Sequence, residues 1–263
     1  MKSTVTERTV GDVLAAVLDT ASDTAFVVAP GAETVEGLVR AVGAGSPSVR
    51  LLADPAVLKT VADDFSVAGR MANRVESGEL EIRRHDGGTN ALVATGSSVA
   101  AVVRGNDCAA GLVTDDDGVV EDTEARLAEA WADADAYDLQ APSLDRVRET
   151  LEAELGRPTA DDFDAILSSD AGGAVDEVTI SLLAAAKNGE LLYDISKWGE
   201  DVGIASKATF SRTKTRMEEQ GVIETEKVPI DVGRPRLRLR LDSDRLETDD
   251  DREFARVARS MLS

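Results

Sequence analysis

The stretch KATFSRTKTRMEEQGVIETEKVPIDVGRPRLRLRL, which runs from Lys207 to Leu241, decides the fold of the C-terminal part of this chain. Ser206, just before it, is a suitable N-cap residue for a helix that ends at Gly221. Three residues recur at helical spacing and can pack inward: Phe210, Thr213 and Met217. From position 236 to 241 Arg alternates with Leu, which is typical of a strand. The stretch therefore predicts one helix followed by a two-stranded ribbon.

Two further helical patterns precede this stretch. VDEVTISLLAAAKNG (175–189) and ELLYDISKWGEDVG (190–203) both carry apolar residues at spacings of three and four, and both end at glycine. Three helices followed by a β-hairpin is the element order of a winged helix. The sequence therefore predicts a winged helix-turn-helix domain at the C-terminal end of the chain.

Charge is distributed unevenly. The whole chain carries a formal net charge of −21. The segment from Lys207 to Arg240 contains nine basic and five acidic residues, so its net charge is +4. The rest of the chain then carries a net charge of −25. The positive region coincides with the helix and the ribbon that a winged helix presents to a phosphate backbone. This coincidence favours duplex DNA as a partner.

Helical geometry divides the polar and basic residues of the third helix into two groups. Four residues share the face opposite Phe210 and are the candidates for contact with base edges in a major groove: Lys207, Ser211, Arg212 and Thr215. Lys214 and Arg216 flank that face and are candidates for phosphate contacts.

In the ribbon, Gly233 permits a tight turn, and Arg234 and Arg236 form a positive wing tip for the sugar-phosphate backbone. We expect Arg238 and Arg240 to be solvated on the polar face of the returning strand. The alternative for the whole stretch is a charged helix followed by an edge strand that its arginines protect from aggregation. A winged helix that binds protein instead of DNA is the main competing interpretation.

The first half of the sequence has a different pattern of apolar residues. Short apolar runs such as TAFVVAP (24–30) and VRLLAD (49–54) alternate with helical patterns, which is typical of βαβ units. From Glu79 several short strands follow one another, separated by Gly-rich turns, which indicates an antiparallel extension of the same sheet. We therefore expect an α/β domain with a mixed sheet and flanking helices. The predicted organisation is this domain, a helical connector and the winged-helix domain with a C-terminal helix, over residues 1–138, 139–173 and 174–263.

Composition limits the cellular setting. Fifty acidic residues against 29 basic ones would destabilise a folded chain in dilute salt. Multimolar salt would screen this repulsion, because the Debye length falls to about 3 Å at 1 M. Since the acidic residues are spread along the chain, we favour a halophilic cytoplasm over the alternative of a basic partner. The N-terminus lacks a signal-peptide pattern, and no segment approaches the ~20 apolar residues of a membrane span, so we expect no membrane partner.

A resemblance supports this interpretation. The segment 182–241, with KATFSRTKTR and VPIDVGRPRLRL as its most specific parts, resembles the C-terminal winged helix of haloarchaeal TbsP-like transcriptional regulators. The resemblance implies a sequence-specific regulator of metabolic genes that acts as a dimer. It also implies roles in DNA binding for part of the third helix and for the wing: Lys207, Ser211, Arg212, Lys214, Arg216, Arg234 and Arg236.

The N-terminal region is more distantly similar to the phospholipase-D-like effector domains of TrmB-type sugar-responsive regulators. The catalytic His-x-Lys-x4-Asp pattern of those enzymes is missing, because His85 is the only histidine and Asp86 and Gly87 follow it. We therefore expect a sensory or dimerising domain and no enzyme. Cys108 is the only cysteine, which excludes a cysteine-based metal cluster, and we expect neither a metal nor a cofactor.

A small metabolite, such as a sugar or a sugar phosphate, is the expected effector. Its contacts should lie beyond the carboxyl ends of the strands, near Ala29 and Pro30. The candidate residues are Gly31, Asp54, Thr95, Ser97 and Ser98.

The C-terminal segment carries an apolar stripe that predicts either a homodimer contact or packing on its own domain: Phe254, Val257, Met261 and Leu262. The sequence thus predicts a cytoplasmic transcriptional regulator that binds double-stranded DNA. A protein-binding adaptor and a metabolite-binding enzyme are the alternatives.

Overall fold

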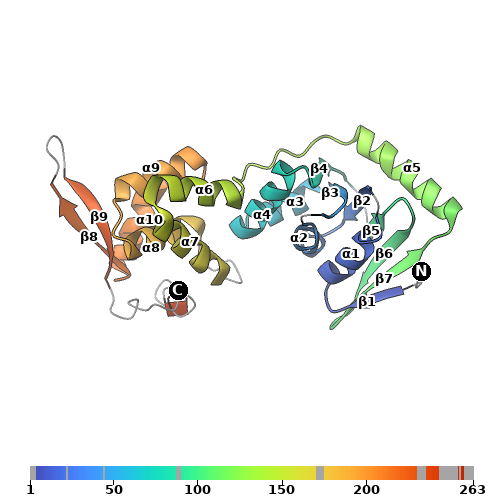
Figure 1. Cartoon of the computed structure of the whole chain (residues 1–263), viewed down its shortest axis with the longest axis horizontal. Helices are drawn as coiled ribbons and strands as arrows, with labels where there is room; N and C mark the ends of the chain where they lie inside the picture. Colours follow the sequence, from blue (N-terminus) through green and yellow to red (C-terminus); the bar gives the residue numbers. More distant parts are fainter. Residues whose placement is uncertain are drawn as a thin grey trace. The chain divides into compact units, whose positions relative to one another are not determined.

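Two units divide the chain, Met1–Gln140 and Ala141–Ser263 (Figure 1). The computed structural model describes residues 4–21, 23–43, 45–86, 90–169, 175–229, 235–242, 254, 256 and 257. Each unit has its own helices and its own sheet, so the units are described separately.

A seven-stranded mixed sheet forms the first unit, in the order β1-β7-β6-β5-β2-β3-β4. The strands are β1 (Thr4–Glu7), β2 (Thr24–Ala29), β3 (Ser48–Ala53), β4 (Leu80–Arg84), β5 (Ala91–Ala94), β6 (Val99–Arg104) and β7 (Ala109–Thr114). β2, β3 and β4 are parallel, whereas β5, β6, β7 and β1 extend the sheet in antiparallel fashion from β2. The predicted mixed α/β fold is confirmed.

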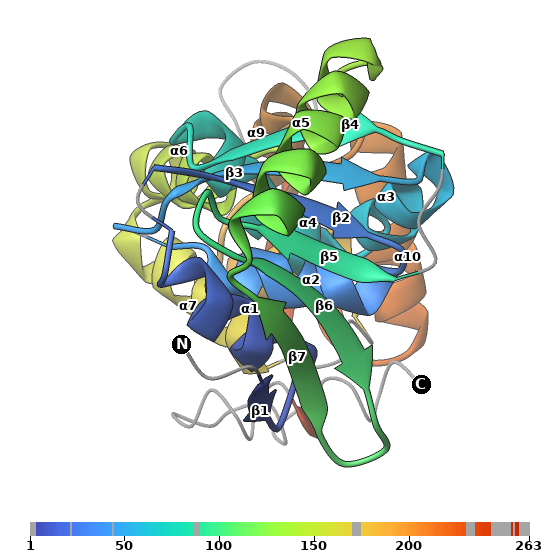
Figure 2. The same ribbon diagram turned by 90° about the vertical axis from the view of Figure 1, so that its right-hand side faces the viewer.

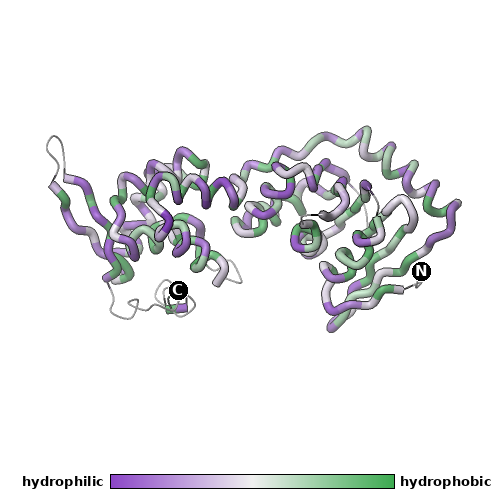
Figure 3. The backbone as a smooth tube through the Cα atoms, viewed as in Figure 1, coloured by the Kyte–Doolittle hydropathy of each residue, from purple (hydrophilic) through white to green (hydrophobic). Residues whose placement is uncertain are grey.

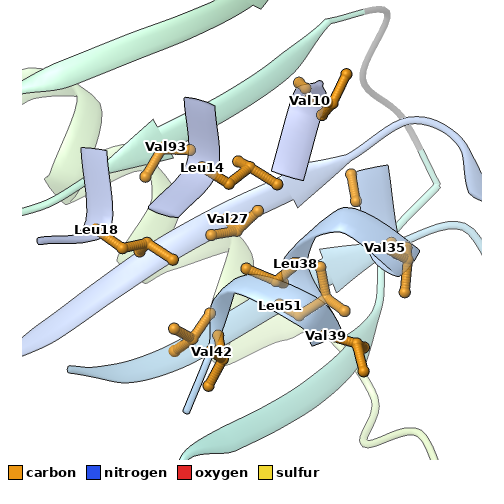
Figure 4. Packing of buried hydrophobic residues seen from close by; sticks show 14 of the residues in the cluster. Val10, Leu14, Leu18, Val27, Val35, Leu38, Val39, Val42, Leu51 and Val93 are labelled. Atoms are coloured by element: carbon orange, nitrogen blue, oxygen red, sulfur yellow. The ribbon is translucent and has the colours of Figure 1, made fainter. Parts of the chain in front are cut away.

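Four helices cover one face of this sheet (Figure 2). They are α1 (Val10–Leu18), α2 (Ala32–Ala41), α3 (Pro55–Ala62) and α4 (Phe65–Glu76). Figure 4 shows how apolar side chains of α1 and α2 meet those of the central strands in one buried cluster, which includes Val10, Leu14, Leu18, Val27, Val35, Leu38, Leu51 and Val93. Leu58 of α3 and Met71 of α4 belong to the same cluster. Small aliphatic residues dominate, so helices approach closely. A Cβ added to Gly37 would lie 3.0 Å from the backbone of Gly11, which shows how tightly α1 and α2 pack.

A single helix, α5 (Asp117–Asp133), crosses the opposite face of the sheet (Figure 2). Trp131 of α5 packs edge-on against Phe26 of β2, with 6.2 Å between ring centroids. The guanidinium of Arg83 lies 4.7 Å from the centre of the Trp131 ring and donates hydrogen bonds to the carbonyls of Trp131 and Ala134. These contacts attach the C-terminal end of α5 to the β4 side of the sheet.

Five helices and a β-ribbon make up the described part of the second unit. They are α6 (Leu144–Leu155), α7 (Arg157–Ser169), α8 (Glu177–Lys187), α9 (Leu192–Val202), α10 (Lys207–Glu219), β8 (Ile223–Val228) and β9 (Arg236–Leu241). The antiparallel ribbon β8-β9 is mostly hydrophilic (Figure 3). The order α8, α9, α10 and ribbon is the predicted order of a winged helix.

The sequence suggests a connector over residues 139–173; its described residues 141–169 belong to this second unit. α6 packs against α9, and α7 packs against α8. Trp198 of α9 is fully buried; its Nε1 donates a 3.0 Å hydrogen bond to Thr150 Oγ1 of α6, and its ring meets that of Phe163 of α7 edge-on at 6.3 Å. The sequence of this segment is amphipathic because α6 and α7 each bury one face against the helices of the winged helix.

The C-terminal stripe is described only in part. Phe254 is fully buried, and Lys187 Nζ of α8 lies 5.3 Å from its ring centroid, so this residue packs within its own unit. Val257 is half-buried. Met261 and Leu262 lie outside the described residues.

Candidate nucleic-acid interface

Local interactions fix the position of α10. The Ser206 hydroxyl caps the helix by accepting a 3.2 Å hydrogen bond from the backbone N–H of Thr209. Phe210 and Met217 are fully buried and Thr213 is nearly so, which confirms the predicted inward face. Gly203 ends α9 in the left-handed conformation, with φ of +93°, and allows the chain to turn into α10.

Gly199 of α9 sets the contact between α9 and α10. A Cβ at this position would overlap the ring of Phe210. The absence of a side chain therefore lets the Phe210 ring lie directly on the α9 backbone. The sequence shows a glycine inside a helical pattern, which signals close packing, but it does not show which ring fills the space.

The opposite face of α10 is open. Five of the predicted DNA-contacting residues are exposed there: Lys207, Ser211, Arg212, Thr215 and Arg216. The structure thus brings the four base-edge candidates together on one face, with Arg216 beside them. A side chain at each of these positions can reach a ligand without movement of the core.

Lys214 does not lie on this exposed face of α10. Its side chain is only 12% exposed, and its Nζ forms a 2.7 Å ion pair with Glu218 one turn later on α10. The other carboxylate oxygen of Glu218 accepts a 2.8 Å hydrogen bond from Thr225 Oγ1 of β8. Lys214 therefore helps to attach α10 to the ribbon, which makes it a weaker candidate for phosphate contact than Arg216.

Most basic residues around this face already have acidic partners. Lys207 Nζ lies 2.5 Å from Glu200 of α9, Arg216 lies 3.2 Å from Asp176 at the start of α8, and Arg236 lies 3.4 Å from Asp194 of α9. The hydrogen bond from Lys207 lowers the pKa of Glu200, and the same contact raises the pKa of Lys207. Both residues are charged at neutral pH.

Arg212 differs from its neighbours. Its guanidinium donates a 3.3 Å hydrogen bond to Thr209 Oγ1, and within the described chain it forms no ion pair. Among the predicted base-edge residues it therefore presents an uncompensated positive charge.

The ribbon is described up to Pro229 and again from Pro235, so Gly233 and Arg234 lie outside the described residues. The guanidinium of Arg236 lies 4.6 Å from the centre of the Tyr193 ring, besides its ion pair with Asp194. Arg240 pairs with Glu226 at 3.0 Å on the exposed side of the ribbon. Arg238 is half-buried, contrary to the expectation of a solvated side chain, because its side-chain stem lies beside Gly189 in the turn between α8 and α9.

The candidate ligand residues of the first unit do not form one group. Gly31 and Asp54 follow β2 and β3, which are parallel, so both lie at the carboxyl edge of the sheet. Thr95, Ser97 and Ser98 follow β5, which is antiparallel to β2, and therefore lie at the opposite edge, roughly 20 Å away for a strand of this length.

Those residues have structural partners. The Asp54 carboxylate caps α3 through a 2.7 Å hydrogen bond from the Ala56 N–H. The Thr95 and Ser98 hydroxyls are buried and 2.9 Å apart, which closes the β5-β6 turn, whereas Ser97 is exposed. Of the original set, Gly31 lines a cleft of the first unit.

Comparison with known proteins assigns both units. The family model described as "Transcriptional regulator TbsP-like, N-terminal" matches residues 2–142, and the model of the C-terminal HTH domain of the same family matches residues 143–259. The chain belongs to the TbsP-like transcriptional regulators. It is therefore a DNA-binding transcriptional regulator with a C-terminal helix-turn-helix domain.

Other comparisons add little to this assignment. No curated protein matches the chain. A solved structure of TrmBL2, described as an archaeal chromatin protein with a novel mode of DNA binding, is similar at 16% sequence identity and a TM-score of 0.39. The match covers 52% of this chain and 54% of TrmBL2, so this member of the TbsP-like family corresponds to about half of that protein.

Two features of the described residues bear on other functions. They contain no helix that is long and apolar enough to cross a membrane. Nor do they contain a group of three or more His, Cys, Asp or Glu side chains arranged to hold a metal ion.

Proposed function

We propose that this TbsP-like protein binds specific sites in double-stranded DNA through the exposed face of α10. The observation that carries the proposal is the division of α10 into a fully buried apolar side and an exposed side of small, polar and basic residues. A major groove admits one helix and distinguishes base pairs by their donors and acceptors. Lys207, Ser211, Arg212 and Thr215 read base edges in this proposal.

Arg216, Arg234 and Arg236 contact the backbone on either side of the reading face. Arg216 is exposed beside that face, and Arg236 stands at the start of β9. Their guanidinium groups suit bidentate contacts with phosphate oxygens. Arg234 completes the wing tip on the basis of its position in the sequence alone.

The regulated genes are metabolic genes of a halophilic archaeon, and the protein acts in the cytoplasm. This part of the proposal rests on the resemblance stated above and on the acidic residues, which are spread over both units. The first unit senses a small metabolite and conveys its presence to the DNA-binding unit.

The active form is a homodimer. Val103 and Leu112, on the neighbouring strands β6 and β7, are 51% and 53% exposed and share the sheet face that α5 leaves partly open (Figure 2). An uncharged surface of this kind supports contact between two strongly acidic copies, because it adds no like-charge pairs. Leu112→Asp should therefore convert the dimer to a monomer in sedimentation experiments.

Mobility-shift assays and footprinting in high salt test the DNA-binding proposal. The double variant Lys207→Ala/Arg212→Ala should lose its preference for the selected site, and Arg236→Ala should weaken binding to all sequences by a similar factor. Lys59→Ala/Arg126→Ala, which removes the same charge from exposed positions of the first unit, is the matched control.

If the double variant keeps its site preference, the assignment of the reading face is wrong. The absence of any DNA binding by the wild type would instead favour a protein-binding adaptor. The ion pairs at Lys207, Arg216 and Arg236 are the observation behind that second candidate, because they leave less free positive charge for phosphate.

A further inference from the structure

A cleft of about 580 Å3 opens at the carboxyl end of β2 in the first unit. Its walls come from the start of α2, the end of β6 and Val10 at the start of α1, which Figure 4 labels. A second hollow of about 360 Å3 adjoins it and shares Val10, Glu33 and Arg104. Together they are large enough for a small organic molecule, since ligand pockets typically measure about 300–1,000 Å3.

Hydrogen-bond donors without partners converge on this cleft. Gly31 is the N-cap of α2 and provides no side-chain acceptor. In the described chain no hydrogen bond is made by the N–H groups of Ala32 and Glu33, both of which line the cleft. The positive end of the α2 dipole thus points its free N–H groups at this space.

The side chain of Thr34 is the second and independent observation. Thr34 lines the same cleft and is 8% exposed, so more than nine-tenths of the residue is buried. Its hydroxyl forms no hydrogen bond with any part of the chain that the structure describes, and it is not among the side-chain atoms that are shut off from solvent without a partner. The hydroxyl is therefore reached from the cleft, where it is free to donate a hydrogen bond to a ligand.

Positive charge surrounds these donors. Arg104, at the end of β6, lines both hollows, and Arg8 lines the smaller one. Arg104 Nη1 forms an ion pair with the carboxylate of Glu33, the second residue of α2. That carboxylate occupies the position in which an anionic ligand would meet Arg104. The Arg104 side chain is 66% exposed and the Glu33 side chain 48%, so the pair can be exchanged.

We propose that this cleft binds a small phosphorylated metabolite, with its phosphate group at the start of α2. The phosphate accepts hydrogen bonds from the N–H groups of Ala32 and Glu33, from the Thr34 hydroxyl and from Arg104, which releases Glu33. Phosphate fits this donor set because it has three acceptor oxygens and a charge near −2. The rest of the volume holds the organic part. This inference names the effector of the proposed regulator and rests on that function for its biological role, although binding itself does not depend on DNA.

Gly31→Asp is the sharpest variant. Gly31 has φ of −156° and ψ of 160°, which any residue adopts, and a Cβ there would meet no atom within 4 Å. Asp is a preferred N-cap residue, so its carboxylate would accept the free N–H groups of α2 and repel a phosphate without destabilising the helix. Gly31→Ala adds a side chain without charge and is the matched control.

Titration calorimetry of the full chain in high salt tests the proposal with three probes: glycerol 3-phosphate, inorganic phosphate and glycerol. Glycerol 3-phosphate should bind and glycerol should not. Inorganic phosphate should bind more weakly if the organic part contributes, and equally well if free phosphate is the effector. Arg104→Ala should weaken binding about tenfold or more, and Thr34→Val about two- to tenfold. Arg126→Ala, an exposed arginine of α5, should have no effect.

Two results would overturn the proposal: no heat of binding with either phosphate probe, or unchanged binding in Gly31→Asp. A DNA mobility-shift assay on the same preparations distinguishes a failure of the phosphate site from a failure of the proposed DNA-binding function. A wild type that binds its DNA site but neither phosphate probe refutes this site alone, whereas a wild type that binds phosphate but no DNA refutes the proposed function alone.

Discussion

Neutralising Glu200 should strengthen DNA binding. Glu200 lies on α9, and its carboxylate accepts hydrogen bonds from both the Nζ, at 2.5 Å, and the backbone N–H, at 3.3 Å, of Lys207. In the proposed complex Lys207 must exchange this carboxylate for DNA. Glu200→Gln removes the competing charge and keeps a side chain of nearly the same shape, so α9 and α10 should retain their packing.

The expected magnitude follows from the exposure of the pair. The side chains of Lys207 and Glu200 are both 44% exposed, so solvent screens their attraction. Removing the acidic partner of an exposed ion pair of this kind should raise the affinity for DNA about two- to fivefold. The salt dependence should change as well. Wild-type Lys207 releases a cation from DNA but leaves Glu200 to take one up, whereas the variant only releases one, which steepens the slope of log affinity against log salt by up to about 0.9.

Fluorescence anisotropy with a labelled site, measured over a series of KCl concentrations, gives both quantities. Asp201→Asn is the matched control, because Asp201 neighbours Glu200 on α9 but pairs with Lys197 at 2.7 Å. Equal effects of the two substitutions would mean that only the net charge matters. An unchanged slope in Glu200→Gln would refute the contact between Lys207 and phosphate or base.

Three further predictions concern stability. Gly199→Ala should lower the free energy of unfolding by about 1–3 kcal/mol in chemical denaturation, because the new methyl group overlaps the Phe210 ring. A fragment 141–263 should fold by circular dichroism, whereas 175–263 should not, because it lacks the helices that cover α8 and α9. Burial raises the pKa of Glu190, so its protonated form favours folding and stability falls as pH rises through that raised value. Glu190→Gln should therefore be more stable than wild type at neutral pH and less sensitive to pH.

Controls make these results decisive. Gly118→Ala changes a glycine in α5 where a Cβ would lie 3.4 Å from Asp116 Oδ1, and it should be neutral or stabilising. If Gly199→Ala behaved in the same way, the close contact of α9 with α10 would be disproved. A folded 175–263 fragment would show that α6 and α7 are dispensable. A Glu190→Gln variant whose stability follows pH as the wild type does would exclude Glu190 as the responsible group.

The sequence predicts the path of the backbone in the second unit well because each element carries its own signals. Ser206 as a cap, Gly221 as a stop and the spacing of Phe210 and Met217 determine α10 from local interactions alone. The same local rules give the exposed face, since residues on the opposite side of a helix cannot also be buried. They fail for Lys214, whose position depends on Glu218 and on Thr225 of the ribbon.

In the first unit, the order of the strands in the sheet is what the sequence pattern does not give. The close succession of strands after Glu79 indicates antiparallel pairing, which β5, β6 and β7 confirm, whereas β4 is parallel to β3. The pattern does not show that β5 pairs with β2, so it does not reveal that Thr95 and Ser98 lie at the edge opposite Gly31. The cleft at α2 was predictable only through Gly31, because it depends on Arg104 and Thr34, which are 70 residues apart and meet through the order of strands in the sheet. Long-range pairing of this kind has no local signal.

The ion pairs around α10 are compatible with the proposed DNA-binding face on so acidic a chain. Lys207 and Arg236 pair with acids of α9, and Arg216 pairs with the acid that caps α8, so these cations occupy defined positions in the free protein. Paired cations attract phosphate weakly at long range, which reduces sequence-independent binding. In the proposed complex, binding then depends on contacts close enough to exchange the carboxylates, and Arg212, which has no ion pair in the described part of this face, would make the first of them.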